Sequence, residues 1–360
     1  MRILLEGRNL ANYLAKCHEA FRTGLRALFD ARSFGRGYPG GWYRFVTRSY
    51  SGIIRRVFPD ASPHVVLTRL THPYGLEFRG MAEVDAVRAT ILGDYWVQAR
   101  KCHAAMVEFL EKNRLDAVLT YFPQPMEIWR DTPLSGRFIH MPPSFDPKIF
   151  HDRKMPKDYD VGFLAAGTAR PMSHYPERSA IHRKLLGRKD LRYLWARHPG
   201  WRDRIWHPLV GEGFSRAINS CRMFITTGGR LKNAHAKYVE ILASRTLLLA
   251  DEPIGAQRLG LEDGVNYVRI AVDDVLDKVD YYLGHPEEAE RIAAAGYAMA
   301  HRLHHCYRRA LEFYEAITEK FPHLKECEGP RDDCDVLADL RTQGAVDAGP
   351  ARKAGPADRT

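Results

Sequence analysis

The sequence predicts an α/β protein of two doubly wound domains, each a parallel sheet with helices on both faces. Three observations favour this fold class. Short apolar runs typical of buried strands alternate with longer segments of helical composition along most of the chain. One proline-rich stretch, MPPSFDPKIF, interrupts this alternation, which then resumes. The 360 residues are also enough for two cores of ordinary size.

The proline-rich stretch marks the expected domain boundary, because proline lacks a backbone donor and disfavours helix in the residue before it. We place an N-terminal domain at residues 1–143 and a C-terminal domain, with closing helices, at residues 144–327. Residues 328–360 are rich in Asp, Ala, Gly and Pro and hold few large apolar side chains. Such a segment cannot bury enough surface to offset its ordering entropy, so we expect a disordered tail.

Strands in the N-terminal domain are expected where β-branched and apolar residues cluster between turn residues, at 2–6, 64–70, 116–120 and 137–140. Helices are expected at 10–29, with Asn9 as its N-cap, and at 81–112.

The C-terminal domain repeats the alternation. Its strands are expected at 160–165, 191–196, 223–227 and 246–250. Its helices are expected at 177–186, 209–221, 236–244 and over most of 273–321, with breaks at 285–286 and at Gly296.

Composition is typical of a soluble globular protein, with 45% hydrophobic and 27% charged residues. The N-terminus lacks the uninterrupted apolar core of a signal peptide, and no apolar run approaches the ~20 residues of a membrane span. The six cysteines are scattered and form no CxxC pair, so we interpret them as reduced thiols of a cytoplasmic protein.

The net charge of +10 favours anionic partners such as phosphorylated metabolites, nucleic acid or a membrane surface. Residues 167–204 hold ten Lys or Arg against three acids, a pattern that also fits a solvated basic face. Nucleic-acid binding rests on charge alone, and no recognition motif accompanies it. We therefore expect no nucleic-acid partner.

The stretch GGRLKNAHAKYVEILASRTLLLADEP, residues 228–253, carries the strongest site signal. The strand before it ends in Thr227, Gly228 and Gly229, and ligands of open parallel sheets bind at the carboxyl ends of strands. Glycines let the backbone approach a ligand closely, and the positive N-terminus of the next helix suits a phosphate. Lys232, His235 and Lys237 add hydrogen-bond donors there.

Glu240 follows Lys237 by one helical turn. A carboxylate at this place can accept two hydrogen bonds from the vicinal hydroxyls of a ribose. A local cap or salt bridge is the alternative interpretation of the same residue.

Three segments in order resemble bacterial group 1 glycosyltransferases, particularly the spore-maturation (CgeB-like) type. They read PPSFDPKIFHDRKMPKDYDVGFLA, KYVEILASRTLLLADEPIGAQRLGLEDGVNYVRI and YYLGHPEEAERIAAAGYAMAHRLHHCYRRA. That family commonly shows basic-x-x-Glu, then Ala-x-Gly, an apolar strand and an acidic-Gly-x-x-Tyr. The resemblance covers about half the chain, residues 142–310.

The resemblance implies the GT-B fold, two facing Rossmann-like domains that hold a nucleotide-sugar mainly on the C-terminal one. It implies that Glu240 binds the donor ribose and that Lys237 lies near the diphosphate as the catalytic cation. Two positions depart from the pattern: Lys232 stands where many relatives carry an acid, and Arg245 replaces the glycine of Ala-x-Gly. The sugar contacts and the anomeric outcome therefore stay open.

The loop at residues 166–178 follows the first strand of the C-terminal domain. By resemblance, Gly167, Thr168 and Arg170 contact the diphosphate, since Arg forms forked bonds to phosphate oxygens. Arg178 fits this interpretation and fits equally an incidental surface arginine.

An inverting transferase needs a base near the acceptor hydroxyl, and His18 and His72 are the N-terminal candidates. Either also fits a structural or surface histidine. His301, His304 and His305 share a helix face but lack a third-ligand pattern, and GT-B enzymes generally work without a catalytic metal. We therefore expect no metal and no cofactor beyond the donor substrate.

Residues 42–58 combine apolar residues at helical spacing with four arginines. Such a helix can lie on an anionic membrane at the inner face, or simply pack on the sheet of its own domain. The first alternative would suit a lipid-linked acceptor, and the second leaves a small-molecule acceptor open.

Together these observations predict a cytoplasmic, metal-independent glycosyltransferase of the hexosyltransferase kind. The alternative is a catalytically inactive sugar-nucleotide-binding partner protein of the same fold, which the Lys232 departure favours.

Overall fold

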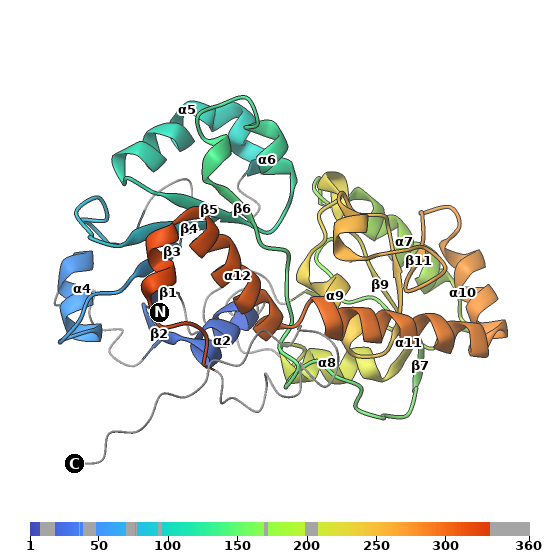
Figure 1. Cartoon of the computed structure of the whole chain (residues 1–360). Coiled ribbons are helices and arrows are strands. Elements are labelled where there is room, and N and C mark those ends of the chain that lie inside the picture. Colours follow the sequence, from blue (N-terminus) through green and yellow to red (C-terminus); the bar gives the residue numbers. More distant parts are fainter. Residues whose placement is uncertain are drawn as a thin grey trace, which may run out of the picture.

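The computed structural model describes residues 1–7, 19–35, 37–38, 48–69, 76, 78–92, 96–168, 172–198 and 208–331. These residues form two lobes side by side, each a parallel sheet covered by helices on both faces (Figure 1). The predicted fold class is confirmed.

The N-terminal lobe contains a six-stranded sheet of order β2-β1-β3-β4-β5-β6. Its strands are β1 (Arg2–Glu6), β2 (Asp30–Phe34), β3 (Val65–Arg69), β4 (Val87–Leu92), β5 (Ala117–Thr120) and β6 (Phe138–His140). Its helices are α2 (Glu19–Leu28), α4 (Tyr50–Val57), α5 (Trp96–Lys112) and α6 (Gln124–Ile128), with a 3₁₀ turn η1 (Ser135–Arg137). Successive side chains of a strand point to opposite faces, so Ile3 and Leu5 pack toward α2 while Leu4 packs with Tyr50 of α4.

The C-terminal lobe contains a five-stranded sheet of order β11-β10-β9-β7-β8. Its strands are β7 (Tyr159–Gly162), β8 (Tyr193–Leu194), β9 (Cys221–Thr226), β10 (Leu247–Ala250) and β11 (Val268–Arg269). Its helices are α7 (Pro176–Gly187), α8 (Glu212–Asn219), α9 (Ala236–Ala243), α10 (Val275–Gly284) and α11 (Pro286–Leu303), with 3₁₀ turns η2 (Gly229–Leu231) and η3 (Ala256–Leu259).

The last helix, α12 (Cys306–Lys320), returns to the N-terminal lobe (Figure 1). Its Phe313 and Ile317 share one core with Ile3 and Leu25. The chain crosses between lobes twice, and the two crossings pair: Phe145 N donates to His304 O (3.1 Å), and Cys306 N donates to Phe145 O (2.8 Å). Residues 306–327, including the 3₁₀ turn η4 (Pro322–Glu326), therefore complete the N-terminal lobe, whereas the sequence analysis grouped them with the C-terminal domain.

The helix predicted at 81–112 is wrong in its first part, where the chain forms β4. The segment VRATIL contains helix-compatible Arg, Ala and Leu, but β3 and β5 pair with it on both sides. The predicted break at Gly296 is also wrong, since α11 runs through it. A Cβ at Gly296 would lie 2.5 Å from Asn266 O and 2.6 Å from Leu242 Cδ2, so the glycine permits close helix packing.

The amphipathic stretch at 42–58 is described from residue 48 onward. There α4 buries Tyr50 and Ile53 in the core and exposes Arg55 and Arg56, so this part packs on its own sheet. Residues 42–47 lie outside the described residues, as do residues 10–18 of the first predicted helix. Within the described part of the chain, no helix has the length and apolarity needed to span a membrane.

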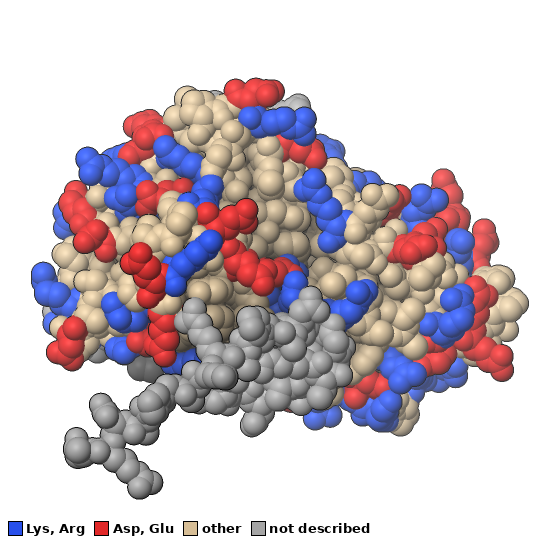
Figure 2. Space-filling model, in the orientation of Figure 1, with Lys and Arg blue, Asp and Glu red and all other residues tan. Residues whose placement is uncertain are grey.

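Charges of both signs are interspersed over the face shown in Figure 2. In the basic segment 167–204, Arg188 pairs with Asp190 (2.6 Å) and Asp280 (2.8 Å), and Arg192 pairs with Asp160 (2.6 Å). These arginines belong to ion pairs of the lobe itself, which weakens the interpretation of this segment as a free anion-binding face.

Candidate functional site

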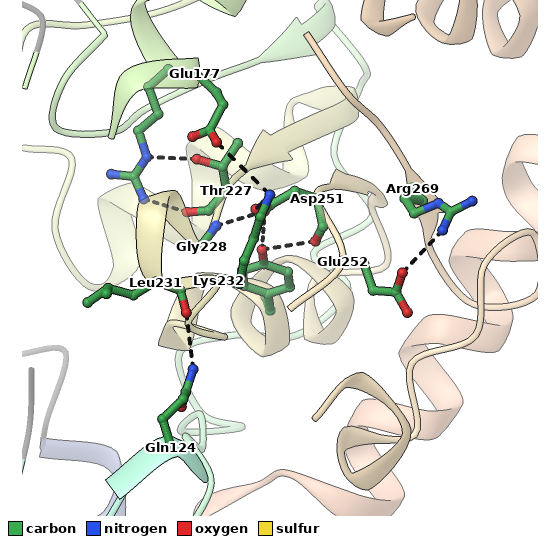
Figure 3. A network of polar contacts seen from close by, with 11 residues as sticks. Gln124, Glu177, Thr227, Gly228, Leu231, Lys232, Asp251, Glu252 and Arg269 are labelled. Atoms are coloured by element: carbon green, nitrogen blue, oxygen red, sulfur yellow. Dashed lines mark hydrogen bonds and ion pairs between the residues drawn. The ribbon is translucent and has the colours of Figure 1, made fainter. Parts of the chain in front are cut away.

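The loop between β9 and α9 is held by Asp251, which follows β10 (Figure 3). One oxygen of Asp251 accepts hydrogen bonds from Gly228 N (2.7 Å) and Tyr238 Oη (2.5 Å), and the other accepts one from Lys232 Nζ (3.1 Å). A buried carboxylate with three donors is fully paired. The loop at the carboxyl edge of the sheet is therefore fixed before any ligand binds.

The positive charge of Lys232 is paired with carboxylates in this network. Besides its ion pair with Asp251, its Nζ lies 4.0 Å from Glu177 Oε1 of α7. Its backbone adopts the left-handed conformation, with φ of 52°. Lys232, at the position where many relatives carry an acid, thus connects the site loop to Asp251 after β10 and to Glu177 of α7.

Arg178 braces the same loop from α7. It is 4% exposed and donates to Thr227 Oγ1 (3.0 Å), Thr227 O (2.5 Å) and Ala166 O (3.1 Å), while its guanidinium stacks 3.6 Å from the Tyr175 ring centroid. The interpretation of Arg178 as an incidental surface arginine is wrong, because its donors are used inside the lobe.

The two predicted phosphate loops meet at Tyr175. Gly167 and Gly229 both adopt positive φ, and a Cβ on Gly229 would lie 2.5 Å from His174 O. Thr168 is buried and donates its hydroxyl to Ala165 O (3.0 Å). The structure thus brings the loop after β7 and the loop after β9 to one edge, while Arg170 lies outside the described residues.

Lys237 and Glu240 lie one turn apart on α9. Lys237 Nζ donates to Leu164 O and lies 5.5 Å from the Phe214 ring centroid. Glu240 is 7% exposed, and its carboxylate has no hydrogen bond or ion pair with any residue that the structure describes, although its oxygens still reach solvent. Burial raises the pKa of Glu240 to about 7, and the Lys237 charge opposes this shift.

The local cap or salt bridge considered for Glu240 is therefore not what the described residues show. The side chain is largely buried while its oxygens stay accessible and unpaired among the described residues, so a ligand with hydroxyl donors could bind them.

The N-terminal lobe touches the site loop through the segment between β5 and α6. Gln124 Nε2 donates to Leu231 O (3.0 Å) and Asn233 Oδ1 (3.0 Å), and Gln124 reaches from α6 toward Leu231 in Figure 3. The Phe122 ring meets the His235 ring edge-on at 5.8 Å. The sequence analysis missed Gln124 and Asp251, because no local pattern shows which distant element reaches this loop.

The predicted bases His18 and His72 lie outside the described residues. His140, at the carboxyl end of β6, is described: burial and the charges of Arg309 and Arg258 lower its pKa to about 4. It is therefore neutral at physiological pH.

The histidines near the end of α11 serve separate local contacts. His301 Nε2 lies 3.2 Å from Ala243 O, His304 Nε2 lies 2.8 Å from Leu259 O, and His305 Nδ1 accepts from Arg308 N (3.2 Å). Among the residues with described positions, no group of three or more potential ligands could hold a metal ion.

A cavity of about 770 Å³ lies at the amino ends of strands β1, β3, β4 and β5 in the N-terminal lobe. Two pairs of its polar side chains already bond to each other: Arg2 contacts His64 (2.9 Å), and Arg88 pairs with Asp116 (2.9 Å). These internal pairs make it a weaker candidate than the edge that carries Glu240.

The chain is similar to known proteins over part of its length. Residues 171–315 match a family model described as glycosyl transferase-like, and this range contains Thr227 to Glu240. No curated protein matches the chain. Similar solved structures include the Anabaena protein Alr3699/HepE in complex with UDP and glucose, with 11% identity, coverage of 89% of this chain and 100% of that one, and a TM-score of 0.59.

Two further structures agree. Sucrose-phosphate synthase from Thermosynechococcus elongatus shares 11% identity over 90% of this chain and 100% of that one, with a TM-score of 0.56. A glycosyltransferase from Rickettsia africae shares 10% identity over 89% and 98%, with a TM-score of 0.56. The chain has the GT-B fold. The matched residues run from just before α7 into α12, and they include the part of the C-terminal lobe that carries Lys237 and Glu240.

Proposed function

We propose that the protein is a glycosyltransferase that moves a sugar from a nucleoside-diphosphate sugar to an acceptor hydroxyl. The observation that carries this proposal is Glu240, a buried carboxylate without a described hydrogen-bond partner, on the helix that begins at the carboxyl edge of the sheet. Two ribose hydroxyls would satisfy it. The glycosyl transferase-like match and the UDP named with the similar Anabaena structure support the same ligand class.

In this proposal each predicted residue keeps its role. Glu240 binds the donor ribose, and Lys237 faces the diphosphate; an ammonium has three N–H donors, so its bond to Leu164 O is compatible with a phosphate contact. The loop of Thr227, Gly228 and Gly229 lies beside the diphosphate in this proposal, with the N–H of Gly228 already bonded to Asp251. Gly167, Thr168 and Arg170 approach it from the loop after β7.

The reaction breaks the bond between the sugar C1 and the diphosphate oxygen and forms a bond from C1 to the acceptor oxygen. The diphosphate leaves with the bonding electron pair, and a fixed cation such as Lys237 stabilises that charge. The acceptor proton passes to a base, for which His18 and His72 remain the proposed residues.

The finer assignment rests on the sequence motifs. We infer a hexose donor, a spore-maturation (CgeB-like) relationship, and transfer without metal or cofactor in the cytoplasm. A lipid-linked acceptor reached through residues 42–58 and a small-molecule acceptor are both proposed partners.

A second candidate is a catalytically inactive sugar-nucleotide-binding protein of the same fold. Lys232 favours it, because this residue replaces a family acid and is tied to Asp251 and Glu177. Slow hydrolysis of the donor by the wild-type protein in the absence of acceptor would contradict this candidate.

The experiment is a thermal-shift screen against UDP-, GDP-, dTDP- and CDP-sugars, followed by donor hydrolysis with and without EDTA. A ligand that binds only the folded state stabilises it by about 2.7 kcal/mol at 100 times its Kd. We expect one nucleotide class to raise the Tm and hydrolysis to survive EDTA. The absence of a shift with every class would overturn the proposed function, and loss of hydrolysis in EDTA that Mg²⁺ restores would overturn metal independence.

A further inference from the structure

The side chain of Gln124 is buried between the lobes with one half of its amide unused. Gln124 is 5% exposed, and its Nε2 donates to Leu231 O and Asn233 Oδ1 at 3.0 Å each. Its Oε1 is buried and has no hydrogen-bond partner within the part of the chain that the structure describes. A buried acceptor left unpaired costs roughly 1–3 kcal/mol, so its retention calls for a physical reason.

The amide orientation follows from the chemistry of its neighbour. Leu231 O is a backbone carbonyl and can only accept, so the nitrogen of Gln124 must face it. The oxygen is therefore the unpaired atom.

The segment that carries Gln124 lies against the loop after β9 and the loop after β10. Phe122 contacts His235 just before α9, and a Cβ on Gly255, after β10, would lie 3.3 Å from Pro123 Cγ. Gln124 thus stands where the N-terminal lobe meets the loop that carries Lys232, and this loop leads into the helix that carries Glu240.

We propose that Gln124 binds the sugar of the donor, with Oε1 accepting a hydrogen bond from a sugar hydroxyl. This inference rests on the proposed function. An amide oxygen needs a partner that carries a hydrogen. Diphosphate oxygens are ionised at neutral pH and carry none, and Glu240 is assigned to the ribose. The remaining donors are the N–H groups of the base and the hydroxyls of the sugar, and we assign Gln124 to the sugar.

The test is calorimetric titration of wild type, Gln124→Met and Gln124→Glu with UDP and with UDP-glucose, or with the nucleotide pair that the thermal-shift screen selects. The readout is the ratio of the two Kd values, because this ratio cancels any effect of the loop on the shared nucleotide. Gln124→Met keeps the length of the side chain and removes the acceptor. We therefore expect the ratio of the Kd for UDP to the Kd for UDP-glucose to fall about 3- to 10-fold. Gln124→Glu keeps an acceptor oxygen and should retain the ratio of wild type.

The matched control is Gln257→Met, since Gln257 is exposed on η3. Its ratio should equal that of wild type, and thermal unfolding without ligand confirms that each variant is folded. An unchanged ratio in Gln124→Met would overturn the inference. An equal loss in Gln124→Met and Gln124→Glu would assign the residue to loop anchoring through Nε2 instead.

Two other outcomes separate the neighbouring hypotheses. If the ratio is unchanged but transfer to acceptor falls in Gln124→Met, the hydroxyl belongs to the acceptor, and the donor-sugar assignment is wrong. If wild type binds none of the nucleotides, the proposed function fails and this inference fails with it.

Discussion

Glu240 is a largely buried carboxylate at a place where a neutral group would make the folded protein more stable. Burial raises its pKa from 4.5 to about 7, so the folded state holds the proton more tightly than the unfolded chain does. By linkage, the stability that this proton supplies is complete below about pH 4.5 and is lost as the pH rises through 7.

Replacing Glu240 by Gln should therefore stabilise the protein at pH 8 while weakening donor binding. Since one pKa unit corresponds to about 1.4 kcal/mol, the gain in the free energy of unfolding is on the order of 3 kcal/mol, and it should vanish near pH 4. Urea unfolding at both pH values measures this, with exposed Glu287→Gln as the control. Equal stability of Glu240→Gln and wild type at pH 8 would show that the carboxylate carries no burial cost.

Replacement of Lys237 should lower kcat, whereas replacement of Glu240 should mainly weaken donor binding. The charge on the leaving diphosphate grows as the glycosidic bond breaks, so Lys237→Ala should lower kcat by ~10²-fold, by analogy with losing one oxyanion donor. Lys237→Arg should restore this only partly, because a planar fork does not reproduce a compact ammonium. Saturation kinetics in the donor measure both variants. An unchanged kcat in Lys237→Ala would remove this residue from the chemistry.

At the scale of helices and strands, α12 lies near the C-terminal end of the sequence but packs in the core of the N-terminal lobe. A Cβ on Gly24 of α2 would lie 2.1 Å from Cys306 O and 3.2 Å from Ala310 Cβ, so the glycine allows the two helices to approach closely. Burial of Phe313 and Ile317 beside the strands depends on that approach.

Gly24→Ala should destabilise the protein by about 1–3 kcal/mol, although alanine is the better helix former. The control is Gly187→Ala at the end of α7, where no atom lies within 4 Å of the added Cβ. Thermal unfolding of the two variants measures the difference. A Tm for Gly24→Ala at or above that of Gly187→Ala would contradict the packing of α12 on α2.

Elements with strong local signals could be predicted from the sequence, and elements defined by distant neighbours could not. The strands at 2–6 and 116–120 are apolar and bounded by turn residues, and both appear within a residue of their predicted bounds. β4 was missed because its residues also suit a helix and its state depends on pairing with β3 and β5. The return of α12 was missed because nothing local distinguishes it from α11.

The same limit applies to the candidate site. The sequence predicts Gly228, Lys237 and Glu240 because they follow one strand within a few residues. Asp251 and Gln124 reach the loop from other elements, so only the three-dimensional arrangement shows them.

For the whole molecule, the lobes are joined by two paired crossings and by the Gln124 contact. The chain ends also meet: Met1 donates to Glu328 O, and Arg331 N donates to Leu28 O (2.9 Å). The described part of the predicted tail, residues 328–331, thus contacts the N-terminal lobe.

Truncation after Arg331 should leave the Tm and donor binding unchanged, because residues 332–360 hold few large apolar side chains. Truncation after Leu303 removes α12 and exposes the core around Ile3, so the N-terminal lobe should unfold. Circular dichroism melting curves of both truncated chains measure this. A folded N-terminal lobe without α12 would show that the lobe does not need the returning helix.

The central claim is a donor site at Glu240, and calorimetric titration of the nucleotide-sugar selected by the screen tests it most directly. We predict that wild type and the control Glu287→Ala bind with the same Kd, while Glu240→Ala binds at least ~10-fold more weakly, since it loses hydrogen bonds to a charged group. If Glu240→Ala, folded by circular dichroism, binds as tightly as wild type, the nucleotide lies elsewhere and the claim is wrong.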